Sequence, residues 1–416
     1  MIIDLLSLSL AAAAATAFAP DVAPESEEPE EPTAFEGFSQ PDPAAEPVPA
    51  PAPATDDGAG PPTWIAGAFV DTSYLLNSNF PGNHLYAGAV THPRTGEFTL
   101  NVVAAQLRHE ATEDEPLRFE LALHAGAAVD ALYAGEPVPG GAAGNFAGPE
   151  VWKHIALANA GYRFASGTEI DAGLQGAPIG VGGFWSKDNW TYSPALASNA
   201  VPYYLMGLRV AQDLPKGLRA EAWMVNGWQT IGDVNKAPSG LVGLHWAGGR
   251  TTAAAQVFFG PEQADLDPES WFVHVDTQVI WDGRPVGVAV VADAGREGRT
   301  AGGQDSYWIG GGVWVRGFLW ETERSALVLA ARPEAWGDPN GRIYGTPQTL
   351  LSGTIGPSLY LRDLLQVRLE YRYDRSLASD GFFLRGDSLA LVDDQHTVML
   401  NLLGKVEHAF ARRRPQ

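Results

Sequence analysis

The sequence predicts an all-β protein, a transmembrane antiparallel up-and-down β-barrel of about 16 strands, an even number within the range of such barrels. Three observations predict this fold. After Trp64 many segments alternate between apolar and polar residues, and short turns alternate with long loops rich in Gly and Pro. After Ala19 no stretch reaches the roughly 18 apolar residues that indicate a membrane-spanning helix. Because only helices and closed barrels satisfy every backbone hydrogen-bonding group in lipid, a membrane-embedded chain of this kind must form a barrel.

Residues 1–19 have the pattern of a secretory signal peptide. A run of apolar and small residues extends from Leu5 to Ala19 and ends in Ala17-Phe18-Ala19, a small-x-small cleavage pattern. The run is shorter than the ~20 residues of a transmembrane anchor, which is the alternative interpretation. The segment before the run lacks Lys and Arg and contains Asp4, which departs from the usual signal-peptide charge. We predict export, with the signal peptide removed near Ala19.

Residues 20–62 form a predicted disordered, acidic, Pro-rich linker. Residues 20–60 contain eleven Asp or Glu and no Lys or Arg, about half of the formal net charge of −22. This composition buries too little apolar surface to offset the entropy of ordering, and its prolines keep the chain extended. The acidic balance argues against nucleic-acid binding, which requires basic surface. Because the chain has no Cys, disulfides, thiolate metal sites and thiol nucleophiles are excluded.

Three segments illustrate the expected barrel strands. From Leu117 to Val129, apolar residues at odd positions alternate with residues such as Arg118 and Glu120. The segment 271–281 begins and ends with Trp and carries His, Asp and Gln on its second face, and the segment 365–374 has a wholly polar or charged second face. A tilted membrane strand needs about 9–11 residues with aromatic residues at both interfaces, so these segments fit a barrel wall.

The connections between predicted strands fall into two classes. Short hairpin turns are predicted at 165–167, 215–217, 247–249, 282–283 and 362–363. Longer Gly- and Pro-rich loops are predicted at 131–150, 229–239, 261–269, 294–304, 333–347 and 376–394. Outer-membrane barrels have short turns at one rim and long loops at the other, so this alternation favours the barrel.

The last predicted strand has one apolar face from Val398 to Phe410. Outer-membrane barrels characteristically end in a strand that finishes on an aromatic residue and is read by the barrel-assembly machinery. We therefore assign residues 63–410 to an outer-membrane β-barrel with Phe410 as its barrel-closing signal. Outer-membrane lipid and the assembly machinery are its expected partners. Residues 411–416, a basic tail, follow Phe410 and depart from the usual ending.

Several segments resemble the OmpL-like β-barrel porin family of proteobacteria. The resemblance extends from Trp64 to Phe410 and rests on five motifs in order: Phe69-Val70-Asp71-Thr72-Ser73-Tyr74 with Asn77 to Pro81; Gly173 to Gly180; Asn189 to Ser193; Val225-Asn226-Gly227-Trp228; and Glu370-Tyr371-Arg372-Tyr373-Asp374. The glycine passage continues with Val181-Gly182 where the family has an acidic residue. The resemblance implies passive diffusion of small hydrophilic solutes or ions through an outer-membrane pore. It implies no catalytic residues and no cofactor.

In such a pore, charged residues at water-facing strand positions would bias which ions pass. The candidate pore-lining residues are Arg118, Glu120, Arg209, Arg219, Glu221, Arg368, Glu370, Arg372 and Asp374. The alternative is that these charges only neutralise one another within the wall. The mixture of signs leaves the ion preference open.

Residues 176–200 form a loop longer than a hairpin requires. The loop contains five candidate constriction residues, Trp185, Lys187, Asp188, Trp190 and Tyr192. Our hypothesis is that this loop folds inward, narrows the pore and contacts the solute. The alternative is an external loop without contact to the lumen.

Other functions find less support in the sequence. No Gly-x-Ser-x-Gly elbow, Walker loop or His-Glu-x-x-His helix occurs, and the nine His are scattered, so we predict neither an enzyme nor a metal site. A soluble exported β-protein that binds glycans through exposed Trp is the main alternative, and an outer-membrane barrel enzyme is a weaker one. The solute and any homo-oligomeric state stay open.

Overall fold

The computed structural model describes residues 64–410, except 90, 113, 135, 137–151, 234, 264–265 and 301–302. The predicted signal peptide (1–19), the linker (20–62) and the basic tail (411–416) lie outside the described residues.

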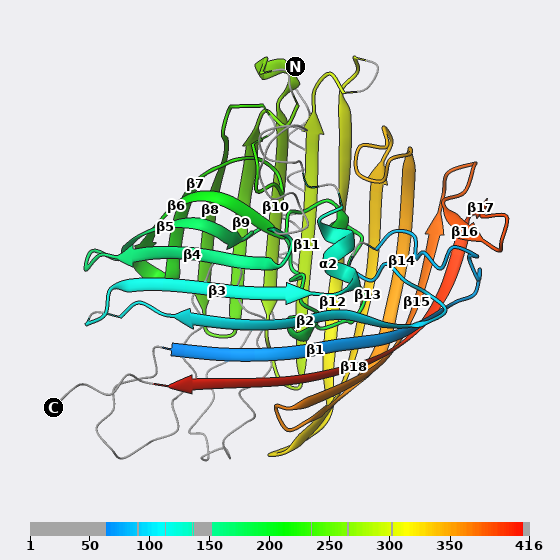
Figure 1. Cartoon of the computed structure of the whole chain (residues 1–416), viewed down its shortest axis with the longest axis horizontal. Helices are drawn as coiled ribbons and strands as arrows, with labels where there is room; N and C mark the ends of the chain where they lie inside the picture. Colours follow the sequence, from blue (N-terminus) through cyan, green and yellow to red (C-terminus); the bar gives the residue numbers. More distant parts are fainter. Residues whose placement is uncertain are drawn as a thin grey trace, which may run out of the picture. The chain divides into compact units, whose positions relative to one another are not determined.

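Within this part of the chain, sixteen antiparallel strands form one closed barrel, as the sequence predicted. Each strand pairs with its chain neighbour, and β1 closes the barrel on β18 in a register that sets Trp64 opposite Phe410 (Figure 1). A small separate hairpin, β16 (Phe383–Arg385) with β17 (Ala390–Val392), stands in the last long loop. The barrel strands are β1 (Trp64–Asn77), β2 (Phe98–His109), β3 (Leu117–Ala125), β4 (Ile155–Arg163), β5 (Thr168–Gly176), β6 (Tyr204–Leu214), β7 (Leu218–Val225), β8 (Ser239–Gly248), β9 (Thr251–Gly260), β10 (Phe272–Trp281), β11 (Val286–Glu297), β12 (Ser306–Thr322), β13 (Ser325–Asp338), β14 (Gln348–Leu361), β15 (Leu365–Ser376) and β18 (Asp394–Phe410).

The two faces of each strand differ because successive side chains of a pleated strand point to opposite sides of the sheet. On β10, Val275 and Val279 are exposed on the outer surface, whereas His274 and Asp276 are buried inside the barrel. The same alternation runs along β15 and β18. An apolar outside and a polar inside are the arrangement expected of a barrel in lipid.

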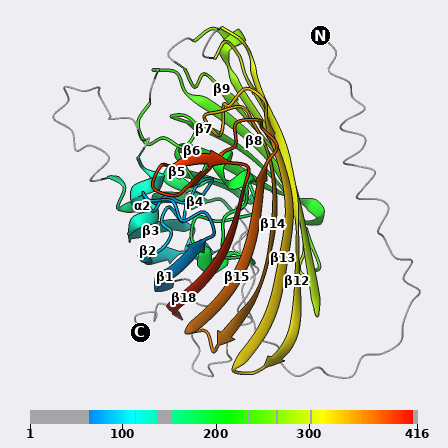
Figure 2. The same cartoon turned by 90° about the vertical axis from the view of Figure 1, so that its right-hand side faces the viewer.

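The two rims carry the two classes of connection that the sequence predicted. All five predicted short turns lie at the rim where β1 begins and β18 ends, which we call the short-turn rim, and the long loops lie at the opposite, long-loop rim (Figure 2). Outward-facing Trp246, Trp281 and Trp320 are exposed near the short turns, in keeping with an aromatic interface belt. Two predicted loops began too early, because β11 continues to Glu297 and β13 to Asp338.

No helix among the described residues is long and apolar enough to cross a membrane.

The sequence prediction of one strand over 117–129 was wrong at its end. Strand β3 stops at Ala125, and Ala127–Leu132 form the short helix α2, with Ala128 and Val129 fully buried. Gly126 makes the break with a φ of 131°, and a Cβ there would lie 2.3 Å from the carbonyl oxygen of Asn101. The small residues after Gly126 fit a strand pattern and a helix equally well, so periodicity could not separate the two.

Part of the barrel interior is a hydrophobic core. Apolar residues of the segment between β5 and β6 pack against inward-facing aromatic side chains of the wall, including Phe258, Phe272, Trp308 and Trp336. Burial of these groups away from water stabilises an inward-folded loop. This core therefore holds the segment between β5 and β6 inside the barrel.

Candidate channel interior

The segment 177–203, hereafter the inner loop, connects β5 to β6 and crosses the inside of the barrel. It contains two short 3-10 turns, Ser186–Asp188 and Ala197–Asn199. Its middle reaches strand β1, where the Tyr192 hydroxyl lies 3.2 Å from the Asp71 carboxylate. A loop buried in this way must have its backbone polar groups satisfied by the wall.

Three buried arginines of the wall supply donors to the backbone carbonyls of the inner loop. Arg332 of β13 donates to the carbonyl oxygens of Ser193 (2.8 Å) and Pro194 (2.9 Å). Arg372 of β15 also donates to Pro194, at 2.5 Å, and Arg368 donates to the Ser186 carbonyl at 2.7 Å. Each of these three arginine residues is 1% exposed. Such charge-assisted bonds are among the stronger protein hydrogen bonds, so these arginines are anchors of the loop.

Two wall carboxylates accept from the backbone amides of the same loop. Glu370 of β15 accepts from the Tyr192 amide at 2.6 Å and the Ser193 amide at 2.9 Å. Glu334 of β13 accepts from the Leu196 amide at 2.7 Å and also binds Arg332 at 2.6 Å. The wall thus satisfies both donors and acceptors of the loop, and the desolvated charges are paired.

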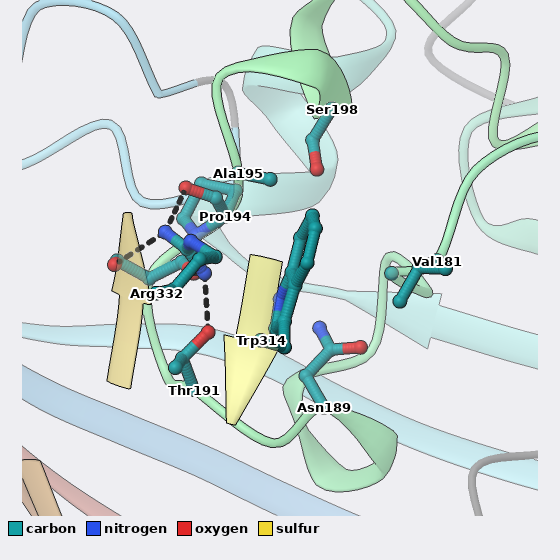
Figure 3. A pocket seen from close by; sticks show the side chains of 10 residues that line it. Val181, Asn189, Thr191, Pro194, Ala195, Ser198, Trp314 and Arg332 are labelled. Atoms are coloured by element: carbon teal, nitrogen blue, oxygen red, sulfur yellow. Dashed lines mark hydrogen bonds between the residues drawn. The ribbon is translucent and has the colours of Figure 1, made fainter. Parts of the chain in front are cut away.

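The contact between loop and wall leaves a small pocket, lined by Arg332 and Trp314 from the wall and by loop residues such as Val181, Asn189 and Ser198 (Figure 3). In the close-up, the Arg332 guanidinium points at the loop backbone and at the Thr191 hydroxyl. Because these donors are already bound by the loop, the pocket belongs to the anchor and offers little to a solute.

A second cluster of charges occupies the wall of β3 to β7. Arg209 binds Glu169 at 3.0 Å and Asp171 at 2.8 Å, and Arg163 binds Glu169 at 2.5 Å. The side chains of Arg118 and Arg163 stay 28% and 26% exposed, in contrast to the fully buried anchors under the inner loop. Part of the accessible charge of the barrel wall therefore lies on the β3 to β7 side.

Residues 65–403 match the model of the protein family described as "Putative beta-barrel porin-2, OmpL-like". The chain belongs to this family. This is a family of porin-like β-barrels, which indicates a protein of the bacterial outer membrane and suggests a channel rather than an enzyme. No protein of curated function matches it in sequence.

Solved outer-membrane barrels resemble the OmpL-like porin in fold. The outer membrane channel DcaP of Acinetobacter baumannii has 11% identity and a TM-score of 0.50, over 82% of this chain and 96% of that chain. OmpF of Salmonella typhi, in a complex with daunomycin, has 13% identity and a TM-score of 0.49, over 84% of this chain and 99% of that chain. OmpT, an outer membrane protein of Vibrio cholerae, has 9% identity and a TM-score of 0.48, over 82% of this chain and 96% of that chain. At such identities the likeness concerns the fold alone.

All nine candidate pore-lining residues of the OmpL-like porin lie on inward strand positions, but in two different settings. Arg368, Glu370, Arg372 and Asp374 are buried behind the inner loop. The other five belong to the β3 to β7 side, which includes the charge cluster: Arg118, Glu120, Arg209, Arg219 and Glu221. Arg368, Glu370 and Arg372 bond to the inner loop, whereas Asp374 pairs with Arg372. In the second group, Arg118 and Glu120 are partly exposed, and the other three residues are buried.

The five candidate constriction residues also divide. Trp190 is 6% exposed and lies under Arg316, whose guanidinium is 4.3 Å from the ring centroid, and Tyr192 is 1% exposed. Lys187 and Asp188 form an ion pair at 2.7 Å, and they and Trp185 keep part of their surface accessible. Within the constriction hypothesis, only these three remain positioned to meet a solute.

Sequence reasoning missed several residues that build the interior. Glu334 was not predicted to line the interior because it lay in the segment 333–347, which was interpreted as a loop, and Arg332 directly precedes that segment. Both residues lie on β13. Glu169 and Asp171 flank Ile170 with the same period-two signal that identified Arg118 and Glu120, so that signal could have found them. Phe410, the predicted closing residue, is the last residue of β18 and stacks with Trp64 at a centroid distance of 6.5 Å.

Two buried side chains at the inner loop, Tyr192 and His92, stay neutral over the physiological pH range. Burial raises the pKa of Tyr192 well above its usual range, aided by the Asp71 carboxylate. Burial, followed by the positive charges of Arg368 and Arg372, lowers the pKa of His92 to about 3. His92 belongs to the loop between β1 and β2, and its ring lies 4.3 Å from that of Tyr192. This packing is therefore expected to be independent of pH.

Glu262, in the loop between β9 and β10, is expected to make the stability of the long-loop rim pH-dependent. Its carboxylate accepts from the Ser239 hydroxyl at 2.6 Å and the Trp228 amide at 2.8 Å, and burial raises its pKa to about 7. A carboxyl whose pKa is raised by folding stabilises the fold below its unfolded pKa, and that contribution is lost as the pH rises toward 7. We expect the midpoint temperature of thermal unfolding of the detergent-refolded protein to decrease as the pH rises from 4.5 to 7.5. In Glu262→Gln this decrease should be smaller. Identical pH profiles for the two proteins would contradict this prediction.

Proposed function

We propose that this barrel is a porin through which small hydrophilic solutes or ions diffuse passively, with the inner loop as its constriction. The observation that carries the proposal is the anchoring of this loop inside the barrel, opposite a wall with accessible charges on β3 to β7. A loop that is fixed in place narrows the bore permanently and does not act as a gate. The charges on the accessible wall would act on permeating ions through the focused field of a low-dielectric channel.

The proposal includes the route to the membrane. Residues 1–19 would direct export and be removed near Ala19, and residues 20–62 would form a linker ahead of the barrel. The strand ending at Phe410 would present the closing signal to the barrel-assembly machinery. The alternative of a soluble exported glycan-binding protein predicts a chain that folds without detergent, and no observation in the barrel favours it.

The decisive experiment is to refold the mature chain in detergent and add it to a planar bilayer. Discrete conductance steps are expected, and their reversal potential in a salt gradient reports ion preference. A chain that forms β-structure without detergent and gives no steps would overturn the proposal.

Deletion of residues 184–193 tests the constriction. We expect a larger single-channel conductance, because the deletion removes much of the inner loop, including the Ser186, Tyr192 and Ser193 groups that the wall binds. A Gly/Ser replacement of equal length serves as control, since it preserves chain length while removing the side-chain contacts. Unchanged conductance in the deletion variant would exclude this loop as the constriction.

A further inference from the structure

Buried oxygen atoms that lack hydrogen-bond donors gather on the inner wall of β9, β10 and β11. They belong to Asp276, Asp293, Gln256 and Gln278, whose side chains are 0% to 4% exposed. We propose that these four residues bind a divalent cation, with Ca²⁺ the ion that best suits a set of carboxylate and amide oxygens. This proposal is independent of what passes through the barrel.

The strand register brings the four side chains together. Asp276 of β10 is directly opposite Gln256 of β9 on one side and Asp293 of β11 on the other. Side chains directly opposite each other have Cβ atoms about 4.5–5.5 Å apart. Gln278 lies on the same face, two residues further along β10. The amide nitrogens of both glutamines reach the carbonyl oxygen of Pro178, at 2.7 and 3.4 Å, so the start of the inner loop covers the cluster.

Five oxygen atoms of this cluster lack a hydrogen-bond partner among the described residues. They are both carboxylate oxygens of Asp276, Oδ2 of Asp293, and Oε1 of Gln256 and of Gln278. The Asp276 carboxylate lies beside that of Asp293, and the Gly180 amide of the inner loop is close to it. Buried acceptors are almost always satisfied in proteins, so a donor or a cation is expected at this place.

The charge balance favours a cation over a single proton. The Trp308 indole N–H, which can only donate, lies 3.0 Å from Nδ1 of His274. His274 is therefore neutral, with its proton on Nε2, which donates to Asp293 at 3.0 Å. No Arg or Lys of the described segments forms an ion pair with either aspartate; the facing groups are His274 and the two glutamine amides. One divalent cation would neutralise both carboxylates, whereas one shared proton would leave a buried negative charge and unpartnered amide oxygens.

The donor set also explains why the pattern of His, Asp and Glu residues gives no sign of a metal site. Among the described residues, no three His, Asp or Glu side chains are arranged to hold a metal ion. Here two carboxylates are completed by two amide oxygens from neighbouring strands. With so few charges, the affinity is expected to be on the order of 0.1–1 mM, as in extracellular Ca²⁺ modules.

Terbium luminescence tests the site, since Tb³⁺ substitutes for Ca²⁺ and is sensitised by nearby Trp. The detergent-refolded full barrel is titrated with Tb³⁺ under excitation of Trp; Trp308 is bonded to His274, next to the cluster. We expect a saturable signal that Ca²⁺ displaces and Na⁺ does not. Asp276→Asn should abolish it, whereas Glu407→Gln, which alters an exposed carboxylate of β18, should retain it.

Further variants and a stability measurement keep the test decisive if Asp276→Asn does not fold. Gln278→Met preserves the shape of the side chain while removing one oxygen ligand, and it should weaken Tb³⁺ binding several-fold. The thermal midpoint of the wild-type barrel should be higher in Ca²⁺ than in EDTA. A non-saturable signal, or a signal retained in Asp276→Asn, would overturn the proposal. A midpoint that depends on pH but is equal in Ca²⁺ and EDTA would show a shared proton instead and would also overturn it.

Discussion

Replacement of Arg332 by Met is expected to release the inner loop and raise the single-channel conductance of the barrel. Arg332 bonds the carbonyls of Ser193 and Pro194 and pairs with Glu334, all in a buried setting. Breaking a buried pair of this kind costs about 3–5 kcal/mol, because the remaining charge loses its partner. Since each 1.4 kcal/mol is about a tenfold change in an equilibrium, the released state of the loop should gain more than about a hundredfold in population. Planar-bilayer recordings should therefore show larger and noisier openings.

The matched control for this variant is Arg209→Met. It also removes a buried arginine paired with carboxylates, but the carboxylates that Arg209 binds, Glu169 and Asp171, lie on the wall and not on the loop. Hydrogen exchange of the amides at 186–196, followed by mass spectrometry, should accelerate in Arg332→Met and not in Arg209→Met. Equal protection of these amides in both variants would show that the loop is held by its apolar contacts and not by Arg332.

The barrel itself could be predicted from the sequence because its physics is local and periodic. Lipid outside and polar groups inside impose alternation on every strand, so the inward orientation of Arg368 and Arg372 followed from their neighbours alone. The number of strands followed from counting such segments, and the lengths of their connections predicted one rim with short turns and one with long loops. The helix α2 was not predicted, because the small residues that follow Gly126 fit a continuing strand as well as a helix.

The anchoring of the inner loop could not be predicted, because it depends on pairs far apart in the chain. Arg332 lies 139 residues from Ser193, and Glu370 lies 178 residues from Tyr192. Only the closed barrel brings them together. The same holds for the cluster around Asp276, whose four side chains come from three strands. Alternation places each residue on the inner face, but it does not say which residues of other strands it meets.

Replacement of Glu169 by Gln is expected to shift the channel toward anions. Glu169 is 1% exposed and contacts Arg163 at 2.5 Å, Arg209 at 3.0 Å and Arg118 at 3.6 Å, as well as Arg219. The substitution would make the net charge of this cluster more positive by one unit. At an effective dielectric of about 20, a unit charge about 8 Å from a permeating ion changes its energy by roughly 2 kcal/mol before salt screening. A several-fold increase in anion over cation permeability should follow.

The measurement is the reversal potential across a bilayer in a salt gradient, taken at low and high ionic strength. The shift should shrink at high salt, because mobile ions in the aqueous lumen screen the field of the cluster. Glu169→Asp is the control, since it retains the charge while altering the contacts, and it should keep the wild-type reversal potential. If Glu169→Gln leaves the reversal potential unchanged at low salt, the arginines of this wall do not face permeating ions. In that case the accessible lining must lie elsewhere on the inner wall, and the charges on β3 to β7 serve only to hold the strands together.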